Sequence, residues 1–402
     1  MLSRTFKAFS YRDFRLMWLG ACTSSIGGWM QIVAQSWLVY TLSGDDPFYL
    51  GLDAFLGQAP IVLFSLVGGV IADRRSRRQM LLISQYIQMT CAFVLAGLVY
   101  FQVVHVWHIL CLSFIVGTAQ SLGGPAYSAL IPTLVGPEDM GNAIALNSIQ
   151  FNLARVIGPT LAGITLKQLN ATWCFGLNGI SFIAVIISLY IIRVNFVPAK
   201  SHEPILTSIQ QGIGFIRSKA GLNSLIVLAF CMTLFGFSLL TFLPVFAKEV
   251  FHGDATTYTR LLVCSGAGSI FGALAIASSN HLKRRGRATL LSLILLGILI
   301  AAFSLSKSLP LSYVLIFCSG ATLMSVFAMI QTLVQTITAD SMRGRVMSVY
   351  NMAFRGGMPV GSLVVGRLIP QFTAPITIAC AGSVLSVLGL YYLLVQRRVA
   401  SL

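Results

Sequence analysis

Long apolar tracts follow one another along the whole chain, with short polar segments between them. A helix needs roughly 20 mostly apolar residues to cross a bilayer, and these tracts have about that length or more. They lack the short alternating pattern of outer-membrane strands, so the pattern favours helices. The predicted helices cover residues 14–41, 48–72, 79–101, 106–129, 143–167, 171–192, 222–246, 259–281, 288–306, 310–337, 345–369 and 373–395. The chain is therefore predicted to be an all-α membrane protein with twelve transmembrane helices.

Composition agrees with this interpretation. Only 9% of the 402 residues are charged and 56% are hydrophobic, whereas a soluble domain carries about 25% charged residues. The first apolar tract is long and has no small-residue cleavage site, so we expect it to be retained as a membrane anchor.

The net charge of +16 could suggest a nucleic-acid partner, but its distribution argues against one. Lys and Arg gather in alternate loops, within residues 4–15, 74–78, 193–219, 283–287, 343–345 and 397–398. The opposite loops hold only Lys167, Lys248, Arg260, Lys307 and Arg367. Because cytoplasmic loops retain Lys and Arg, the pattern predicts that both termini are cytoplasmic. We expect no nucleic-acid partner.

The middle of the chain holds its least hydrophobic long stretch, residues 193–221. Residues 206–218 are predicted to form a short amphipathic helix at the cytoplasmic membrane surface. Six predicted helices precede this stretch and six follow it. We therefore expect an N-terminal half at 1–192, an interdomain linker at 193–221 and a C-terminal half at 222–402.

An internal repeat supports the two halves. The segments "NLARVIGPTLAG" and "NMAFRGGMPVGSLVVG" both place a proline four residues after an arginine, at Arg155–Pro159 and Arg355–Pro359, 200 positions apart. The charged segment "ADRRSRR" recurs as "NHLKRRGR" without its aspartate. A duplicated six-helix unit is typical of transporters, whose substrate sites lie between the repeats near the bilayer midplane.

These motifs identify a resemblance to the major facilitator superfamily over the full length. "GGVIADRRSRR" resembles the superfamily's signature between its second and third helices, although Ser76 stands where a glycine is usual. "GPTLAG", with Gly158, Pro159 and Gly163, is similar to a motif of antiporters on the fifth helix. "ALIPTLVGPEDMGNAIALNS" and "RGRVMSVYNMAFRGGMPVGSLVVG" resemble the drug and siderophore exporter branch, which includes enterobactin exporters and macrolide efflux proteins.

The resemblance implies a cytoplasmic gate between the helices at 48–72 and 345–369. The gate residues are Gly69, Asp73, Arg74, Arg77, Arg78, Arg343 and Arg345. Asp73 would face the positive end of the second of these helices when the cytoplasmic side is closed. The arginines could bind lipid phosphates or serve only as a topology signal.

Away from the helix ends, three ionisable residues are predicted to lie within the hydrocarbon: Asp53, Arg155 and Arg355. Each costs roughly 2.5–3.5 kcal/mol on the milder insertion scales. Asp53 is the only carboxylate among them and is the candidate proton carrier, unless it reaches the outer surface as a helix-end residue. The arginines either attract an anion into a cavity or tie helices together.

The resemblance implies that the first, fourth, seventh and tenth helices line a substrate cavity. The candidate lining residues are Trp29, Gln31, Gln35, Gln120, Phe235, Ser238, Thr241, Gln331 and Gln335, with Arg155 and Arg355. Apolar walls with a few amides suit an amphipathic organic molecule. Glutamine pairs also join helices in lipid, which is the structural alternative.

Other chemistry finds little support in the sequence. Eight cysteines fall inside predicted helices without a CxxC pair, and there is no GxxxxGK[ST], GxSxG or HExxH motif. We therefore expect no enzyme activity, no cofactor and no metal. Gly266, Gly268 and Gly272 are expected to pack against Gly158 and Gly163 instead of binding a phosphate.

Together these features predict a monomeric secondary transporter of the bacterial inner membrane. It would export an amphipathic small molecule, such as a drug or siderophore, in exchange for protons by alternating access, in contact with membrane lipids. One alternative is an importer or uniporter of a small metabolite with the same fold. Another is a non-transporting membrane scaffold or lipid-handling protein.

Overall fold

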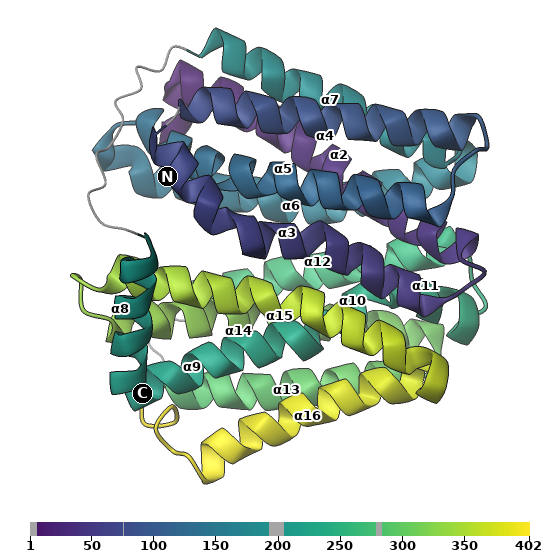
Figure 1. Cartoon of the computed structure of the whole chain (residues 1–402). Coiled ribbons are helices and arrows are strands. Elements are labelled where there is room, and N and C mark those ends of the chain that lie inside the picture. Colours follow the sequence, from purple (N-terminus) through teal and green to yellow (C-terminus); the bar gives the residue numbers. More distant parts are fainter. Residues whose placement is uncertain (1–5, 75, 193–204, 279–283) are drawn as a thin grey trace. The chain divides into compact units, whose positions relative to one another are not determined.

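The computed structural model describes residues 6–74, 76–192, 205–278 and 284–402 (Figure 1). Every regular element in these ranges is a helix. Two compact units are present: Met1–Leu42 with Leu56–His202, and Ser43–Phe55 with Glu203–Leu402. The long helix α3 (Pro47–Arg74) therefore contributes to both units.

The first unit contains the long helices of the N-terminal part of the chain. Besides α3 they are α2 (Arg12–Leu42), α4 (Arg77–Tyr100), α5 (Val106–Leu130), α6 (Met140–Gln168) and α7 (Ala171–Ile191), with the short helices η1 (Lys7–Ser10), η2 (Ile131–Thr133) and η3 (Pro137–Asp139). Helix α2 packs against α6 and α7, and α4 packs against α5 and α7. A cluster of buried apolar side chains, including Met17, Leu130 and Leu189, joins these helices near one end.

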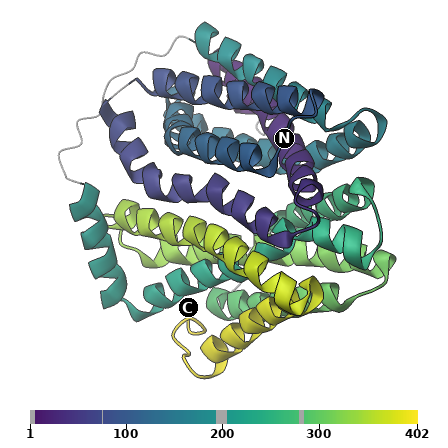
Figure 2. The same ribbon diagram turned by 45° about the vertical axis from the view of Figure 1, so that its right-hand side comes forward.

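The second unit contains the remaining helices; the long ones run lengthwise beside one another, whereas the helix Ile205–Ser218 lies across them (Figure 1 and Figure 2). They are α8 (Ile205–Ser218), α9 (Ala220–Cys231), η4 (Met232–Gly236), α10 (Ser238–Thr241), α11 (Leu243–Val245), η5 (Phe246–Val250), α12 (Ala255–Ser278), α13 (Arg285–Leu305), α14 (Leu309–Ile337), α15 (Arg343–Phe372) and α16 (Ala374–Leu394). Helix α8 lies at the position of the predicted amphipathic helix and packs on α15.

Corresponding helices pack in the same pairs within each unit. The pairs α2–α6, α4–α7 and α4–α5 of the first unit match α9/η4–α15, α13–α16 and α13–α14 of the second. The repeated arginine–proline segments lie on α6 and α15, which are equivalent in this scheme. The duplication read from the sequence is thus repeated in the packing inside each unit.

Nine helical spans in the described residues are long and apolar enough to cross a membrane. Helices α2, α6 and α15 are as long, with 31, 29 and 30 residues, but carry more polar side chains. The all-α membrane fold predicted from the apolar tracts is confirmed, and most helix ends fall within a few residues of the prediction.

The predicted membrane helix at 222–246 is present as one apolar span, Gly221–Val250, but its geometry is not α-helical throughout. The structure divides this part into α9, α10 and α11, with π-helical turns at η4 and η5. Pro244 lies at the start of α11 and has no N–H to donate to the preceding turn. The backbone leaves α-helical geometry at Phe242, where φ is −99° and ψ is 11°.

The expected packing is also wrong for Gly158, Gly268 and Gly272. A Cβ at Gly268 would lie 1.9 Å from the carbonyl oxygen of Phe317, and one at Gly272 would lie 2.0 Å from that of Ala321. Both glycines therefore pack tightly against α14 in the second unit. Gly158 packs instead against α2 in the first unit, where a Cβ would lie 2.4 Å from the Cβ of Trp29.

Candidate functional site

A chain of polar side chains crosses the first unit from α7 through α2 to α5. Asn178 Nδ2 donates to Gln31 Oε1 at 2.6 Å, and Gln31 Nε2 donates to Gln35 Oε1 at 3.4 Å. Gln35 Nε2 then donates to Ser113 Oγ at 2.9 Å. The absence of a side chain at Gly27 admits Asn178, since a Cβ there would lie 2.7 Å from Asn178 Oδ1. The two predicted glutamines therefore also hold three helices together.

The predicted residues Trp29 and Arg155 meet between α2 and α6. The Arg155 Cζ atom lies over the Trp29 ring, 5.5 Å from its centroid. Trp29 in turn makes an edge-to-face contact with Phe151, with ring centroids 6.3 Å apart. Gly158 and Pro159 are buried one turn beyond Arg155, and Gly163 is buried one turn further on. The small residue at 158 lets α2 approach closely enough to place the Trp29 ring beside the guanidinium.

Asp53 lies on α3 and is half-buried. It is the seventh residue of that helix and falls in the segment that belongs to the second unit. This segment lies directly on α15: a Cβ at Gly51 would lie 2.3 Å from the carbonyl oxygen of Ser362, and one at Gly366 would lie 3.3 Å from the Cα of Gly51. The backbones of α3 and α15 thus approach closely because Gly51 and Gly366 place no side chain between them.

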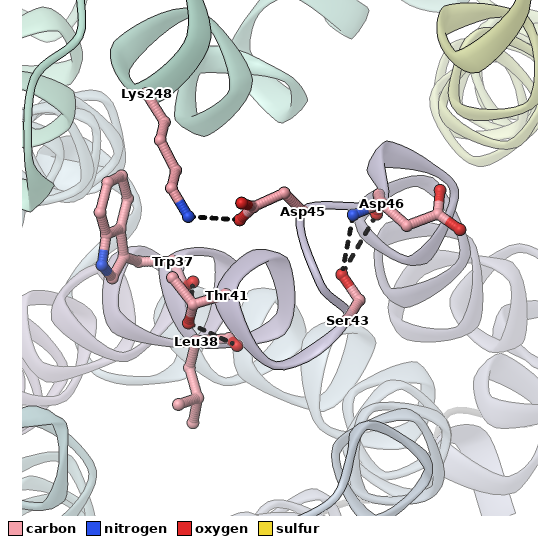
Figure 3. A network of polar contacts seen from close by, with 7 residues as sticks. All are labelled: Trp37, Leu38, Thr41, Ser43, Asp45, Asp46 and Lys248. Carbon is pink, nitrogen blue, oxygen red and sulfur yellow. Dashed lines mark hydrogen bonds and ion pairs between the residues drawn. The ribbon is translucent and has the colours of Figure 1, made fainter.

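An ion pair holds the turn that precedes α3. Lys248, from η5, pairs with Asp45 (Figure 3), and the distance from Lys248 Nζ to Asp45 Oδ1 is 2.5 Å. Asp45 has φ of 67° and follows Gly44 with φ of 71°, so two successive residues are left-handed. Ser43 closes the turn by accepting a hydrogen bond from the Asp46 N–H at 3.2 Å. We did not predict this pair, although a Gly-Asp turn beside an acidic residue between two apolar tracts was visible in the sequence.

The side chains of Gly69, Asp73 and Arg74 in the predicted gate lie outside the described residues. Arg77 and Arg78 are described. Arg77 Nη1 donates to the Ala129 carbonyl oxygen at 2.9 Å, and Arg78 Nη2 donates to that of Tyr190 at 3.0 Å.

The two acceptors of these arginines lie in the last turns of α5 and α7, where helix carbonyls have no intrahelical partner. Arg78 also lies over the Tyr190 ring, 5.7 Å from its centroid. These two arginines of the signature therefore cap helix ends.

The predicted gate residues on α15 make local contacts. Arg343 Nη2 lies 2.5 Å from Asp340 Oδ1, and both side chains are largely exposed. Arg345 Nη1 lies 3.4 Å from Met342 Sδ, and Arg345 has a further polar contact. An exposed pair of this kind contributes about 0–1 kcal/mol to stability.

The remaining cavity candidates differ in exposure. Ser238 is buried, and its hydroxyl donates to the Leu234 carbonyl oxygen one turn earlier at 2.8 Å. The Thr241 and Ser362 hydroxyls lie 3.4 Å apart. Phe235 and Gln331 are half-buried, whereas Gln120, Gln335 and Arg355 are exposed. The structure therefore brings together the candidates of the first unit more closely than those of the second.

A polar cluster missed by sequence reasoning holds the N-terminal segment. Lys7 Nζ lies 3.0 Å from Asp139 Oδ1, and the Tyr11 hydroxyl donates to Asp139 Oδ2 at 3.1 Å. Asp139 is only 5% exposed. Its hydrogen bond and charge raise the pKa of Lys7, and its hydrogen bond raises the pKa of Tyr11.

The long apolar helices pack in matching pairs in the two units, and polar side chains lie between helices within each unit. This arrangement is typical of a multi-pass membrane transporter. The sequence pattern of the transmembrane secretion effector family matches residues 3–401, and the chain belongs to this family of the major facilitator superfamily. This confirms the superfamily resemblance seen in the motifs. The protein is a transporter and not an enzyme.

Similar proteins include transporters of siderophores. The staphyloferrin A transporter of Staphylococcus aureus is 27% identical over 84% of this chain and 85% of its own length. The enterobactin exporter EntS of Escherichia coli is 25% identical over 86% of this chain and 83% of its own length.

Solved structures of other transporters share the fold. A POT peptide transporter has a TM-score of 0.77 and 12% identity, and covers 97% of this chain and 95% of its own. An inward-facing, occupied bacterial homologue of the lysosomal transporter Spinster has a TM-score of 0.75 and 14% identity, and covers 96% of this chain and 97% of its own.

Proposed function

We propose that the protein exports an amphipathic small molecule of drug or siderophore type, in exchange for protons, by alternating access. It would act in the bacterial inner membrane with both termini in the cytoplasm. Membership of the family supports transport, and the names of the similar S. aureus and E. coli proteins favour a siderophore-like substrate and export.

The observation that carries this proposal is the hydrogen-bonded chain across α7, α2 and α5. Amides inside a membrane helix are costly unless they are paired, and Gln31 and Gln35 are paired. Gln31 uses one of its two N–H groups and one lone pair in these bonds, so it keeps a donor and an acceptor for a substrate. A fixed amide beside apolar walls suits an amphipathic molecule.

Proton exchange is assigned to Asp53. A coupled exporter needs a group that gains and loses a proton as access alternates. Arginine stays charged at physiological pH and glutamine does not titrate. Asp53 is a carboxylate well inside a predicted membrane tract, at a distance of about 9 Å along α3 from Pro47.

Transport by the purified protein in proteoliposomes tests the proposal. A panel of catecholates, hydroxycarboxylates and macrolides would be offered with an imposed pH gradient, and the same vesicles treated with a protonophore would serve as the control. We expect uphill movement of at least one compound against the proton flow, lost when the gradient is collapsed. If the compound only equilibrates across the membrane, at a rate independent of the pH gradient, the protein is a uniporter and the proposed proton coupling is wrong.

A further inference from the structure

Arg155 is a cation in the middle of the predicted membrane helix α6, and this helix contains no Asp or Glu. It is the sixteenth of the 29 residues of α6, so either end of the helix is about 20 Å away. No described residue forms an ion pair with it, and the recorded neighbour of its guanidinium is the Trp29 ring. Such a charge is expensive in a membrane and is usually part of a functional site.

The aromatic side of the guanidinium is built by close packing. Because Gly158 has no side chain, α2 approaches α6 and holds Trp29 beside Arg155. Phe151 meets the Trp29 ring edge to face and is itself 53% exposed. A guanidinium that stacks on a ring keeps its N–H donors, which lie in its own plane, for a second partner.

A hydrogen-bond acceptor without a partner lies one turn away. Asn152 Nδ2 donates to the Ser148 carbonyl oxygen at 2.9 Å, but Asn152 Oδ1 is buried and accepts no hydrogen bond. Residues three apart share a helix face, so Asn152 and Arg155 lie on the same side of α6. A buried acceptor without a donor is costly, and a ligand hydroxyl or N–H would satisfy it.

We infer that this part of the first unit binds the carboxylate of an amphipathic hydroxycarboxylic acid. The carboxylate accepts two hydrogen bonds from Arg155, a hydroxyl beside it donates to Asn152 Oδ1, and an aromatic or aliphatic body lies against Trp29 and Phe151. The inference rests on the proposed function, because it names the substrate class of the same transporter. Neutral molecules of similar shape would bind more weakly.

Calorimetric titration of the purified protein in detergent tests the inference without any gradient. The probe is mandelate, an aromatic 2-hydroxycarboxylate, and its matched neutral control is mandelamide. We expect saturable mandelate binding that weakens about tenfold or more in Arg155→Gln, and less in Arg155→Lys, which keeps the charge but loses the planar fork. Arg260→Gln, which removes an exposed guanidinium on α12, should bind as the wild type does.

A second variant tests the hydroxyl contact. Asn152→Leu should lower the affinity for mandelate to that for phenylacetate, which has no hydroxyl, and should leave phenylacetate binding unchanged. Inorganic phosphate, which supplies charge without an apolar body, should compete poorly. Gel filtration and circular dichroism would verify that each variant is folded.

Several results would overturn the inference. They are no mandelate binding to the wild type, equal binding of mandelamide, or undiminished mandelate binding to folded Arg155→Gln. Mandelate binding that depends on Arg155, in a protein that transports nothing in proteoliposomes, would instead contradict the proposed function alone. If the protein transports actively but binds mandelate equally well with and without the Arg155 guanidinium, only this inference is contradicted.

Discussion

Lys248 and Asp45, 203 positions apart in sequence, form an ion pair of 2.5 Å within the second unit. The pair fixes the turn before α3 to η5, and a few residues later Gly51 contacts α15. Both charged side chains are about two-fifths exposed. The pair is thus a modest electrostatic contact added to a tight backbone contact.

Removal of this pair should loosen residues 43–55 from α15. In a background without the native cysteines, Ser362→Cys would report on the buried surface beneath Gly51. We expect Lys248→Met to raise its thiol labelling rate about two- to fivefold, because a partly exposed pair contributes about 0.2–1 kcal/mol. The charge swap Asp45→Lys with Lys248→Asp should restore slow labelling, and Lys307→Met should change nothing. Equal labelling in all four proteins would show that the pair does not hold the segment.

Gly158→Ala should destabilise the first unit. The new methyl group would lie 2.4 Å from the Cβ of Trp29 and 2.9 Å from the Ile26 carbonyl oxygen, so α2 has to move. Overpacking of this kind costs about 1–3 kcal/mol. Gly28→Ala on α2 is the matched control, since nothing lies within 4 Å of its added methyl group. Thermal unfolding in detergent should show a lower midpoint for Gly158→Ala and an equal or higher one for Gly28→Ala.

Arg77→Met should lower stability by removing the cap from the end of α5. The Ala129 carbonyl oxygen would lose a charge-assisted hydrogen bond of 2.9 Å, which contributes about 1.5–3 kcal/mol. Arg15→Met, which alters an exposed arginine near the start of α2, provides the comparison. Denaturation curves in mild detergent measure both. Identical curves would mean that Arg77 serves only as a topology signal.

Asp53→Asn should abolish uphill export and leave substrate exchange. The amide keeps the shape of the carboxylate but carries no titrating proton, so coupling is lost while binding remains. Counterflow of labelled substrate in proteoliposomes measures exchange, and accumulation against a gradient measures coupling. Accumulation at the wild-type rate would place the proton site on another residue.

The start of α12 should respond to acid through Asp254. Burial alone would raise the pKa of this carboxyl, but hydrogen bonds from the Thr257 N–H and from the N–H and hydroxyl of Thr256 outweigh it and lower the pKa below 3.8. A lowered pKa in the folded state means that the stabilisation is present above the ordinary value and is lost as the pH falls through the folded one.

Two variants separate the cap from the charge at Asp254. Asp254→Ala should cost about 1 kcal/mol at pH 6, because the helix loses its N-cap. Asp254→Asn should retain most of the stability and lose the acid sensitivity at this site. Unfolding midpoints at pH 6 and near pH 3 would measure both effects. A wild type and an Asn variant that lose stability equally between these pH values would contradict the assignment.

The helices were predictable because lipid imposes a minimum length and an apolar composition on each span. The same reasoning found Arg155 and Asp53, since a charge inside such a tract is conspicuous. It also paired Gln31 with Gln35, which are one helical turn apart. These features depend on neighbours in sequence or on composition alone.

Contacts between distant segments could not be predicted in this way. Nothing in a single sequence links Asp45 to Lys248, or chooses between α6, α14 and any other helix as the partner of a glycine. Gly268 was therefore assigned to the wrong neighbour, although its role as a close-packing residue was correct. The break at Phe242 was not predictable either, because the effect of Pro244 in a membrane helix is set by the surrounding helices.

Helix α3 belongs to two bodies at once, because its residues up to Phe55 group with the second unit and those from Leu56 with the first. A gene split within codons 193–204 would therefore yield two incomplete products. The carboxy-terminal fragment would lack residues 43–55 and the Asp45 partner of Lys248. We expect it to accumulate only when the amino-terminal fragment is made in the same cell, and the two to be purified together. We also expect that cleavage of the linker alone would leave the two fragments bound to each other, because residues 43–55 of the amino-terminal fragment group with the second unit.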